Sequence, residues 1–302
     1  MDGAGNYYAY FPSFSGYQGE FKNNKFVGKG KYFLRKKVYD GEFKDGKYNG
    51  EGTLYFHVGV PSKNYKGEFK DGHFNGKGIL TLNQNVYEGE FKDGEIIKGS
   101  VTFNLLDKSF KDKTQIIYKG EFKNRYPNGK GTLESADEIY VGEFIDGLRN
   151  GKGTLTFKTG RKDKYIGEFK NGQATGKGIY IFENGDKYVG EFKNMDKHGQ
   201  GVYTFIDGRK MEGKYENDIK VGKFIYYSKD GKQVSTQNEN NKETNSLIKK
   251  EEKVTFKLNK DITWIGNAKD GKPHGIGEMP GLGCFEFNNG SPVGPTSCSN
   301  LR

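Results

Sequence analysis

The fold is decided by a stretch that recurs along the chain and is clearest at Tyr39-Asp40-Gly41-Glu42-Phe43-Lys44-Asp45-Gly46-Lys47-Tyr48-Asn49-Gly50-Glu51-Gly52-Thr53-Leu54. Related units follow one another at intervals of 22 to 31 residues, with starts at Tyr17, Tyr39, Tyr65, Tyr87, Tyr118, Tyr140, Tyr165 and Tyr188. Self-similarity at a short period indicates a solenoid-like array in which each unit contacts its neighbours. The sequence therefore predicts one elongated body.

Within the quoted stretch, Tyr39, Gly41 and Phe43 alternate with charged residues. This period of two is typical of a strand with one aromatic and one charged face. The stretch Gly50–Phe56 has the same alternation, with Gly, Gly, Leu and Phe on one face. Asp45-Gly46 tolerates positive φ, as a tight turn requires. Each unit is therefore predicted to be a β-hairpin.

Glycine weakens a strand unless a neighbouring group needs the space that a side chain would fill. Most units have Gly-x-Gly in the second strand, and we expect Tyr and Phe rings to pack over these glycines. The unit that starts at Tyr87 departs from the pattern, with Gly99-Ser100-Val101 instead.

These residues resemble the MORN repeat, whose pattern is close to Tyr-x-Gly-x-x-x-x-Gly-x-x-x-Gly-x-Gly. The resemblance covers about two thirds of the chain. It implies an all-β fold, an elongated single-layer antiparallel sheet of repeated β-hairpins. A degraded ninth unit is expected at Met211–Phe224, and a separated unit at Trp264–Gly277.

The sequence predicts four regions. Residues 1–16 are expected to form an N-terminal cap, residues 17–228 the array of about nine units, residues 229–258 a polar linker or excursion, and residues 259–302 the separated unit with a Gly/Pro-rich tail. The polar region lacks aromatic residues up to Lys253 and has a disorder-like composition, with a weak signal for a short helix over 246–253.

Composition indicates a thin layer and not a thick core. Only 32% of the 302 residues are hydrophobic, whereas the chain has 46 glycines, 23 phenylalanines and 20 tyrosines. A single layer with an aromatic face exceeds the apolar patch that a soluble monomer tolerates. The sheet is therefore expected to curl, to form a homodimer or to hold a partner.

No catalytic or metal-binding pattern is present. The sequence has no His-x-x-x-His and no Cys-x-x-Cys, and Gly151-Lys152-Gly153-Thr154 lacks the spacing and the helix of a phosphate-binding loop. We predict that the protein is not an enzyme and that it uses no cofactor and no metal.

The leading functional hypothesis is a scaffold or adaptor that holds a helix or an extended segment of a protein partner along an aromatic-glycine groove. The resemblance implies a cytoskeletal, ciliary or membrane-to-cytoskeleton setting. The predicted groove residues are Tyr39, Phe43, Tyr65, Phe69, Tyr140, Phe144, Tyr165, Phe169, Tyr188 and Phe192. Glutamate at Phe169 and Phe192 is predicted to abolish partner capture.

The alternative is a phosphoinositide-binding peripheral membrane adaptor, suggested by the net charge of +10. Its anionic-lipid row would be Lys29, Lys77, Lys130, Lys152 and Lys177. Nucleic acid is disfavoured because the basic residues are interleaved with Glu. The only cysteines, Cys284 and Cys298, suit a reducing compartment, and no apolar segment suggests secretion. The expected location is therefore cytoplasmic, at the cytoskeleton, the cilium or the cytoplasmic membrane face.

Overall fold

The fold was analysed in a computed structural model that describes residues 3–9, 15–57, 63–104, 115–160, 162–239, 253–257, 263–269, 272–279, 283–288 and 291–296. The chain divides into two compact units, one of Met1–Asn104 with Ile117–Arg125 and one of Leu105–Ile116 with Tyr126–Arg302. The described residues contain strands and turns and no helix.

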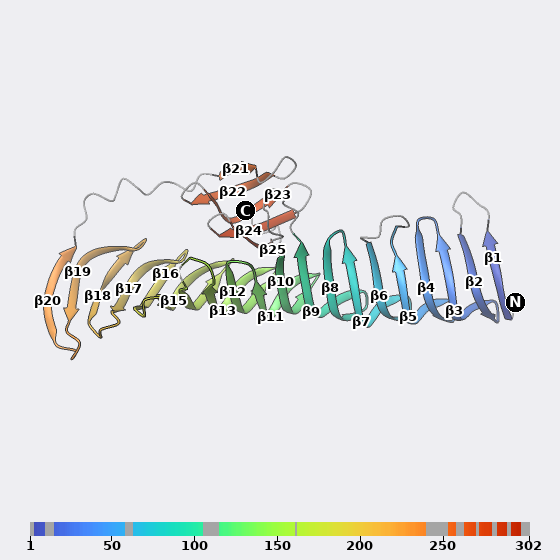
Figure 1. The fold of residues 1–302 in the computed structure, drawn as a ribbon, viewed down its shortest axis with the longest axis horizontal. Coiled ribbons are helices and arrows are strands. Elements are labelled where there is room, and N and C mark those ends of the chain that lie inside the picture. Colours follow the sequence, from blue (N-terminus) through green and yellow to red (C-terminus); the bar gives the residue numbers. More distant parts are fainter. Residues whose placement is uncertain are drawn as a thin grey trace. The chain divides into compact units, whose positions relative to one another are not determined.

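The first unit is a row of antiparallel strands that pair in chain order (Figure 1). Its strands are β1 (Gly3–Ala9), β2 (Ser15–Lys22), β3 (Lys25–Leu34), β4 (Lys37–Lys44), β5 (Lys47–Tyr55), β6 (Lys63–Lys70), β7 (His73–Leu82), β8 (Asn85–Lys92), β9 (Glu95–Asn104) and most of β10 (Gln115–Lys123).

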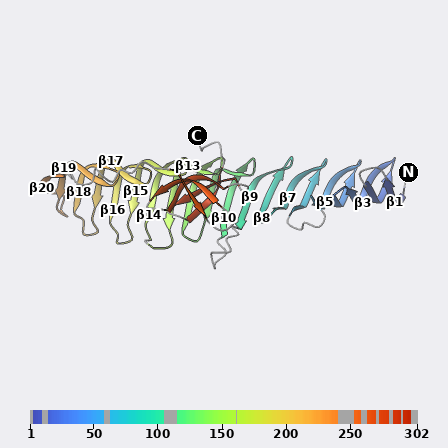
Figure 2. The same ribbon diagram turned by 90° about the horizontal axis from the view of Figure 1, so that it is seen from above.

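The second unit contains a row of the same kind, and Figure 2 shows its strands side by side in chain order. The row consists of β11 (Tyr126–Glu134), β12 (Glu138–Ile145), β13 (Leu148–Phe157), β14 (Lys164–Lys170), β15 (Gln173–Ile181), β16 (Lys187–Lys193), β17 (Asp196–Thr204), β18 (Lys210–Glu216), β19 (Ile219–Tyr227) and β20 (Gln233–Glu239). A five-stranded sheet follows, with β21 (Lys253–Lys257), β22 (Thr263–Lys269), β23 (Lys272–Met279), β24 (Gly283–Asn288) and β25 (Ser291–Thr296). The prediction of an all-β fold of consecutive antiparallel hairpins is confirmed.

The two-residue turns have the geometry that their sequences favour. Asp45 has φ of 51° and Gly46 of 80°, and positive φ at both positions is the type I′ turn that matches strand twist. The Gly46 N–H donates to the carbonyl oxygen of Phe26, at 3.0 Å, and the Gly72 N–H donates to that of Tyr48, at 2.9 Å. Each turn is thus tied to the preceding hairpin.

A bulge follows the first-strand glycine. In the second hairpin Gly41 lies opposite Gly52, but Phe43 lies opposite Tyr48, so one residue of β4 faces three of β5. Gly50 lies in this bulge with φ of 61°, a left-handed conformation that glycine adopts without strain. Because a bulge bends its strand, the repeated glycine gives successive hairpins a bend at the same position.

The fourth hairpin differs, as its sequence predicts. Gly89 pairs with Gly99, and one fewer residue separates the two glycines than in the second hairpin. Its bulge is therefore smaller. Val101 occupies the second-strand position beside Tyr87 and is fully buried.

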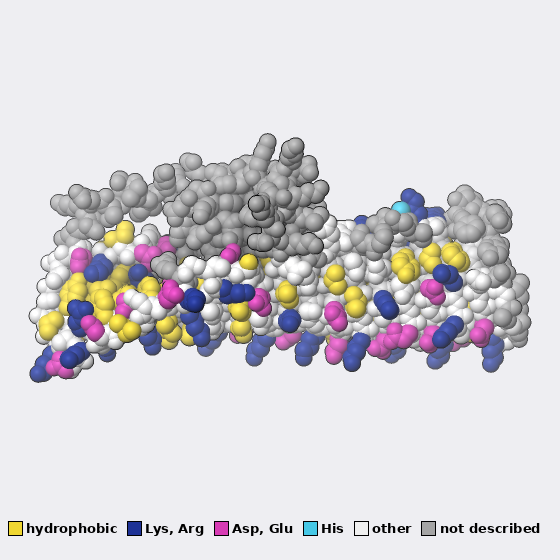
Figure 3. All heavy atoms as spheres, viewed as in Figure 1, with side chains coloured by type: hydrophobic (Ala, Val, Ile, Leu, Met, Phe, Trp, Pro, Cys, Tyr) yellow, Lys and Arg dark blue, Asp and Glu magenta, His cyan; other side chains and the backbone are white. Residues whose placement is uncertain are grey.

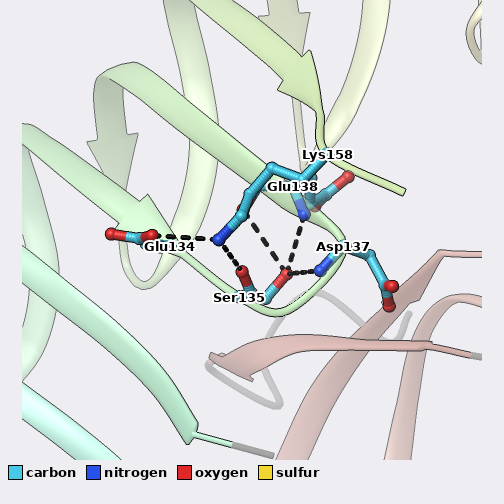
Figure 4. Close-up of polar contacts among 5 residues, drawn as sticks. All are labelled: Glu134, Ser135, Asp137, Glu138 and Lys158. Atoms are coloured by element: carbon cyan, nitrogen blue, oxygen red, sulfur yellow. Dashed lines mark hydrogen bonds and ion pairs between the residues drawn. The ribbon is translucent and has the colours of Figure 1, made fainter. Parts of the chain in front are cut away.

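The longer loops that join consecutive hairpins are linked to one another by side chains. Figure 4 shows the Ser135 hydroxyl accepting hydrogen bonds from the N–H groups of Asp137, at 3.3 Å, and Glu138, at 3.2 Å. Lys158, from the next loop, donates to the Ser135 carbonyl oxygen at 2.9 Å and to Glu134 at 3.0 Å. These bonds hold successive loops of the second unit in register.

One predicted boundary needs correction. The polar region was expected to leave the array at residue 229, but β20 (233–239) pairs with β19 as a further strand. Backbone hydrogen bonds need no apolar side chains, so composition alone misplaced this boundary. The predicted cap contains β1, which pairs with β2. The expected short helix lies outside the described residues except for Lys253, which begins β21.

The separated unit does form a hairpin. Strands β22 and β23 pair Gly266 with Gly277, as Gly41 pairs with Gly52 in the array.

Candidate partner-binding surface

The leading tyrosine of each complete repeat lies across the two paired glycines of its hairpin. An added Cβ at Gly52 would lie 2.6 Å from Cε2 of Tyr39, and one at Gly178 would lie 2.6 Å from Cε2 of Tyr165. Real Cβ atoms do not approach other atoms so closely, so these positions require glycine. The prediction that aromatic rings pack over Gly-x-Gly is confirmed for tyrosine at the second glycine, such as Gly52. The first glycine, such as Gly50, lies instead under the carboxylate of Glu42.

The hydroxyl of the same tyrosine closes the hairpin by donating to the carbonyl oxygen of the glutamate three residues later. These bonds are Tyr17 to Glu20 at 3.1 Å, Tyr39 to Glu42 at 2.9 Å, Tyr65 to Glu68 at 3.1 Å, Tyr118 to Glu121 at 2.7 Å, Tyr140 to Glu143 at 3.0 Å, Tyr165 to Glu168 at 3.1 Å and Tyr188 to Glu191 at 3.3 Å. The carbonyl belongs to the strand segment opposite the bulge, so the bond fixes the bend.

Burial raises the pKa of five of these tyrosines, Tyr17, Tyr39, Tyr65, Tyr165 and Tyr188. For Tyr39, Tyr65, Tyr165 and Tyr188 the removal of water is the main cause, and the pKa lies well above the ordinary value of 10.0. Burial also raises the pKa of Tyr48 to about 12. The phenols therefore stay protonated and remain hydrogen-bond donors at neutral pH.

Aromatic rings connect consecutive hairpins. Tyr39 makes an edge contact with Phe43 of its own hairpin, with centroids 5.1 Å apart, and another with Phe69 of the next, at 5.0 Å. Tyr165 contacts Phe169 at 5.2 Å and Phe192 at 4.9 Å in the same way. We call this row of first-strand rings the aromatic ladder.

The structure places all ten predicted groove residues in the aromatic ladder and buries them. Their exposed fractions run from 0% at Tyr39, Tyr65, Tyr140, Tyr165 and Tyr188 to 5% at Phe43, with Phe69, Phe144, Phe169 and Phe192 between. Glutamate at Phe169 or Phe192 would bury a charge in this core, so those substitutions would test folding and not binding. The alternation in the sequence identified the face on which these rings lie, but it did not show that the rings are buried. The bulge that bends each hairpin inserts residues without changing the alternation.

The exposed aromatic surface lies beside the ladder, on second-strand residues of the same face. In the first unit, Phe26, Tyr48 and Phe74 stack on ladder tyrosines with centroids 3.8 to 3.9 Å apart and remain half-buried. Tyr32 and Phe56 are also half-buried. The Tyr32 ring centroid lies 5.7 Å from that of Phe26, and the Phe56 ring centroid lies 6.1 Å from that of Phe74. We call these five rings the first aromatic patch.

A second aromatic patch lies in the second unit and consists of the half-buried rings of Tyr180, Phe182, Tyr203, Phe205 and Tyr226. Neighbouring rings are in contact. The ring centroid of Phe182 lies 4.7 Å from that of Tyr180 and 5.4 Å from that of Tyr203, and the centroids of Tyr203 and Phe205 are 4.9 Å apart. Hydrophobic side chains also gather over β16 to β19 in the face drawn in Figure 3.

Cations border the second patch. The Lys197 ammonium lies 5.9 Å from the Phe182 ring centre, and the Arg209 guanidinium lies 5.2 Å from that of Phe205. Lys220 lies 5.4 Å from the Tyr226 ring. Lys197 lies opposite Phe192 of the ladder. In the first unit the position opposite a ladder phenylalanine holds an aromatic ring, such as Tyr48 opposite Phe43. Each of these cations already pairs with a carboxylate of the chain, Lys197 with Asp218 at 3.2 Å, Arg209 with Asp207 at 2.7 Å and Lys220 with Glu239 at 3.5 Å, so the second patch suits a mainly apolar surface.

Two buried carboxylates hold two of the rings of the second patch. Asp163 accepts hydrogen bonds from the Tyr180 hydroxyl at 2.7 Å and the Glu183 N–H at 2.8 Å. Asp186 repeats the contact one hairpin later, with the Tyr203 hydroxyl at 2.6 Å and the Ile206 N–H at 2.8 Å. The hydrogen bond from Tyr203 lowers the pKa of Asp186 below its usual range. No sequence signal separated these two aspartates from the exposed ones.

The predicted anionic-lipid row does not form a uniform basic stripe. All five lysines are exposed, but each lies directly across from a glutamate of the next strand. The pairs are Lys29 with Glu42, Lys77 with Glu90, Lys130 with Glu143, Lys152 with Glu168 and Lys177 with Glu191. Cross-strand neighbours of opposite charge offset one another, so the row offers an anionic membrane little net charge.

The glutamates of the repeat have a structural contact that the sequence did not suggest. Glu68 accepts a hydrogen bond from the Lys77 N–H at 2.8 Å, and its carboxylate lies over Gly76 at the bulge. Turn aspartates pair with lysines near the start of the second strand, as Lys25 does with Asp45 at 3.5 Å.

Within the part of the chain that the structure describes, no group of three or more His, Cys, Asp or Glu residues could hold a metal ion. That part also has no helix of the length and apolarity needed to cross a membrane.

Bent hairpins in which a tyrosine ring packs over two paired glycines define a class of β-hairpin repeat modules. The MORN repeat model matches residues 17–35, 39–59, 65–84, 87–96, 118–138, 140–160, 165–187 and 188–208, just over half of the chain, so the protein belongs to the MORN-repeat family. The fourth match stops at residue 96, where that hairpin departs from the others. MORN repeats are in general protein-binding or membrane-binding modules. No curated protein matches the chain.

Proposed function

We propose that the protein is a non-enzymatic scaffold that binds a protein partner through its exposed aromatic patches. The observation that carries the proposal is the second patch, in which the rings of Tyr180, Phe182, Tyr203 and Phe205 touch one another and stay half-buried while the ladder beside them is buried. Aromatic residues are enriched at protein interfaces. The family's role as a binding module supports the same function.

The partner that fits is a helix or extended segment with apolar side chains. These would cover Phe182 and Phe205, whereas the cations at the border already pair with carboxylates of the chain. The orientations of the Tyr180 and Tyr203 rings are preset by Asp163 and Asp186, which lowers the ordering cost of binding. A cytoskeletal or ciliary assembly in the cytoplasm is the proposed setting.

A matched pair of variants tests this function. Phe182→Glu with Phe205→Glu places charges in the second patch, at positions just beyond the ends of β15 and β17. Ile166→Glu with Val189→Glu places the same charges on the opposite face of the sheet, where Ile166 is 36% and Val189 42% exposed. The tagged chains are crosslinked in the cells that make them and recovered. The proposal expects only the first pair to lose crosslinked partners, and equal loss with both pairs, or with neither, contradicts it.

A second candidate function, contact with an anionic lipid surface, is favoured by a different set of residues from the lysine row. The loop Leu34-Arg35-Lys36-Lys37 is exposed throughout, and the neighbouring loop ends at 55–57 and Lys63 add no carboxylate. Figure 3 shows Lys and Arg side chains gathered by the loops over β4 to β6. Each basic residue near an anionic membrane contributes about 1 kcal/mol, and Leu34, 38% exposed, adds apolar contact.

Vesicle sedimentation distinguishes the loop from the row. Alanine at Arg35, Lys36 and Lys37 should abolish binding to vesicles that contain phosphatidylserine or a phosphoinositide, whereas alanine at Lys152 and Lys177 should not. Equal binding to neutral vesicles, or binding that is unaffected by the loop substitutions, would exclude this candidate.

A further inference from the structure

The tyrosines of the second patch recur at one position of three consecutive hairpins. Tyr180, Tyr203 and Tyr226 lie on the second strands β15, β17 and β19, each directly opposite the residue that opens its repeat. One further strand lies between each tyrosine and the next (Figure 2). Because neighbouring strands are about 4.8 Å apart, the three tyrosines recur at about 9.6 Å along the row of strands. We call them the tyrosine row.

Each phenol of the tyrosine row is anchored by a carboxylate and remains half-buried. The hydroxyls donate hydrogen bonds to Asp163, Asp186 and Glu239, in that order, at 2.7, 2.6 and 2.8 Å. The ring of Phe182 packs against the first two tyrosines, with centroids 4.7 and 5.4 Å away. The row therefore presents rings in set orientations at a set interval.

The first unit has no such row. Tyr32 of β3 has the equivalent position, but the next two hairpins have Leu54 and Leu80 there. The exposed rings that stack on the ladder of that unit lie nearly flat on it, with interplanar angles of 13° to 17°. A ligand that needs one ring per hairpin would therefore select the second unit.

The interval matches the repeat of one chain conformation. A polyproline II segment has three residues per turn and advances about 9.3 Å in that turn, so every third side chain of a segment that runs across the strands would meet one tyrosine. Over two intervals the mismatch is under about 1 Å. An α-helix returns to the same face after seven residues, at about 10.5 Å, and would be about 2 Å out of step over the same length.

The charge of the surface also suits such a segment. The bordering cations Lys197, Arg209 and Lys220 each pair with a carboxylate of the chain. The surface therefore favours an uncharged partner over an acidic one. Proline is uncharged, and proline-rich segments dock on aromatic surfaces at low entropic cost because their conformation is already formed.

We propose that the tyrosine row binds a proline-rich segment of a partner protein in the polyproline II conformation, which crosses strands β15 to β19 and places an apolar residue on each tyrosine. This inference rests on the proposed function and specifies the conformation and composition of the segment that the second patch takes.

The probe is a fluorescein-labelled peptide of four Pro-Pro-Leu repeats, titrated with the full chain and followed by anisotropy. Tyr203→Leu removes the central ring and installs the residue that β5 and β7 have at this position, so the substitution suits the strand. We expect saturable binding by the unaltered chain that weakens about tenfold in this variant, which corresponds to ~1.4 kcal/mol.

Tyr32→Leu makes the same exchange in the first unit and should leave peptide binding unchanged. A peptide of the same composition, with an order that breaks the period of three, should bind the unaltered chain more weakly, and circular dichroism checks that both variants fold. No saturable binding of the repeat peptide, equal binding of the two peptides, or equal binding by Tyr203→Leu overturns the inference.

The proposed function is tested separately. Loss of crosslinked partners with Phe182→Glu and Phe205→Glu requires no particular conformation of the partner. Saturable binding of an apolar helical peptide, with none of the Pro-Pro-Leu peptide, would therefore overturn this inference and support the proposed function.

Discussion

At the scale of the residue, the tyrosine that opens each repeat does two things at once. Its ring covers the paired glycines, and its hydroxyl bridges to the backbone opposite the bulge. The sequence showed the first contact, because recurring glycine in a strand needs a large neighbour. It could not show the second, because the acceptor is a main-chain carbonyl that any residue would supply.

Removing the hydroxyl and removing the ring should have separable effects. Tyr165→Phe loses the bond to the Glu168 carbonyl and should destabilise the second unit by about 1 kcal/mol. Tyr165→Ala also empties the space over Gly178 and should cost about 3–5 kcal/mol. Urea unfolding followed by circular dichroism measures both. Tyr55→Phe, at a tyrosine that is 41% exposed, is the control and should leave the transition where it is.

Substitution of the glycines tests whether the change in stability has the expected sign. Gly→Ala in an ordinary strand stabilises by roughly 0.5–1 kcal/mol. Gly178→Ala should instead destabilise by about 1–3 kcal/mol, because the new methyl group overpacks the site against the Tyr165 ring. Gly5→Ala has open space and should be neutral or stabilising. A stabilised Gly178→Ala variant in the same unfolding experiment would show that the ring does not need the glycine.

At the scale of the element, the hairpins and their turns were predictable and their bends were not. Asp45-Gly46 specifies its turn by sequence, and the structure has it. The bulge at Gly50 leaves the alternation intact, so the sequence predicted a groove of ladder rings where the structure has a buried core. Strand β20 was missed because Ser235 and Gln237 pair through their backbones while their side chains resemble a linker.

The links between loops should make the second unit sensitive to acid. Asp186 has a lowered pKa in the folded chain, mainly because the Tyr203 hydroxyl donates to it. Its stabilising effect is therefore present above the ordinary pKa of 3.8 and is lost as pH falls through the lower folded value. The stability difference between the parent chain and Asp186→Asn should be largest near neutral pH and should shrink in that acid range. A difference that stays constant from pH 7 to below the ordinary pKa would contradict this role.

At the scale of the whole molecule, the repetition of one buried phenol makes the protein sensitive to alkali. Burial raises the pKa of Tyr39, Tyr65, Tyr165 and Tyr188 above 10.0, so the unfolded chain releases these protons first. The stabilisation is complete below pH 10 and is lost as pH rises toward the folded values. Circular dichroism and phenolate absorbance recorded together should therefore change in one transition above that pH. Phenolate formation that is complete before the strand signal is lost would show that the tyrosines are accessible in the folded state.

The repeats also leave half-buried aromatic patches beside the buried aromatic ladder. We propose that a protein partner covers these patches. The direct measurement is fractionation of the cells that make the protein, first with a non-ionic detergent and then with salt. The unaltered chain is expected to stay in the detergent-resistant pellet, whereas the Phe182→Glu, Phe205→Glu variant is recovered as a folded protein in the supernatant. Release of the unaltered chain by detergent alone, with the variant behaving identically, would rule out a protein partner on this surface and favour attachment to the membrane.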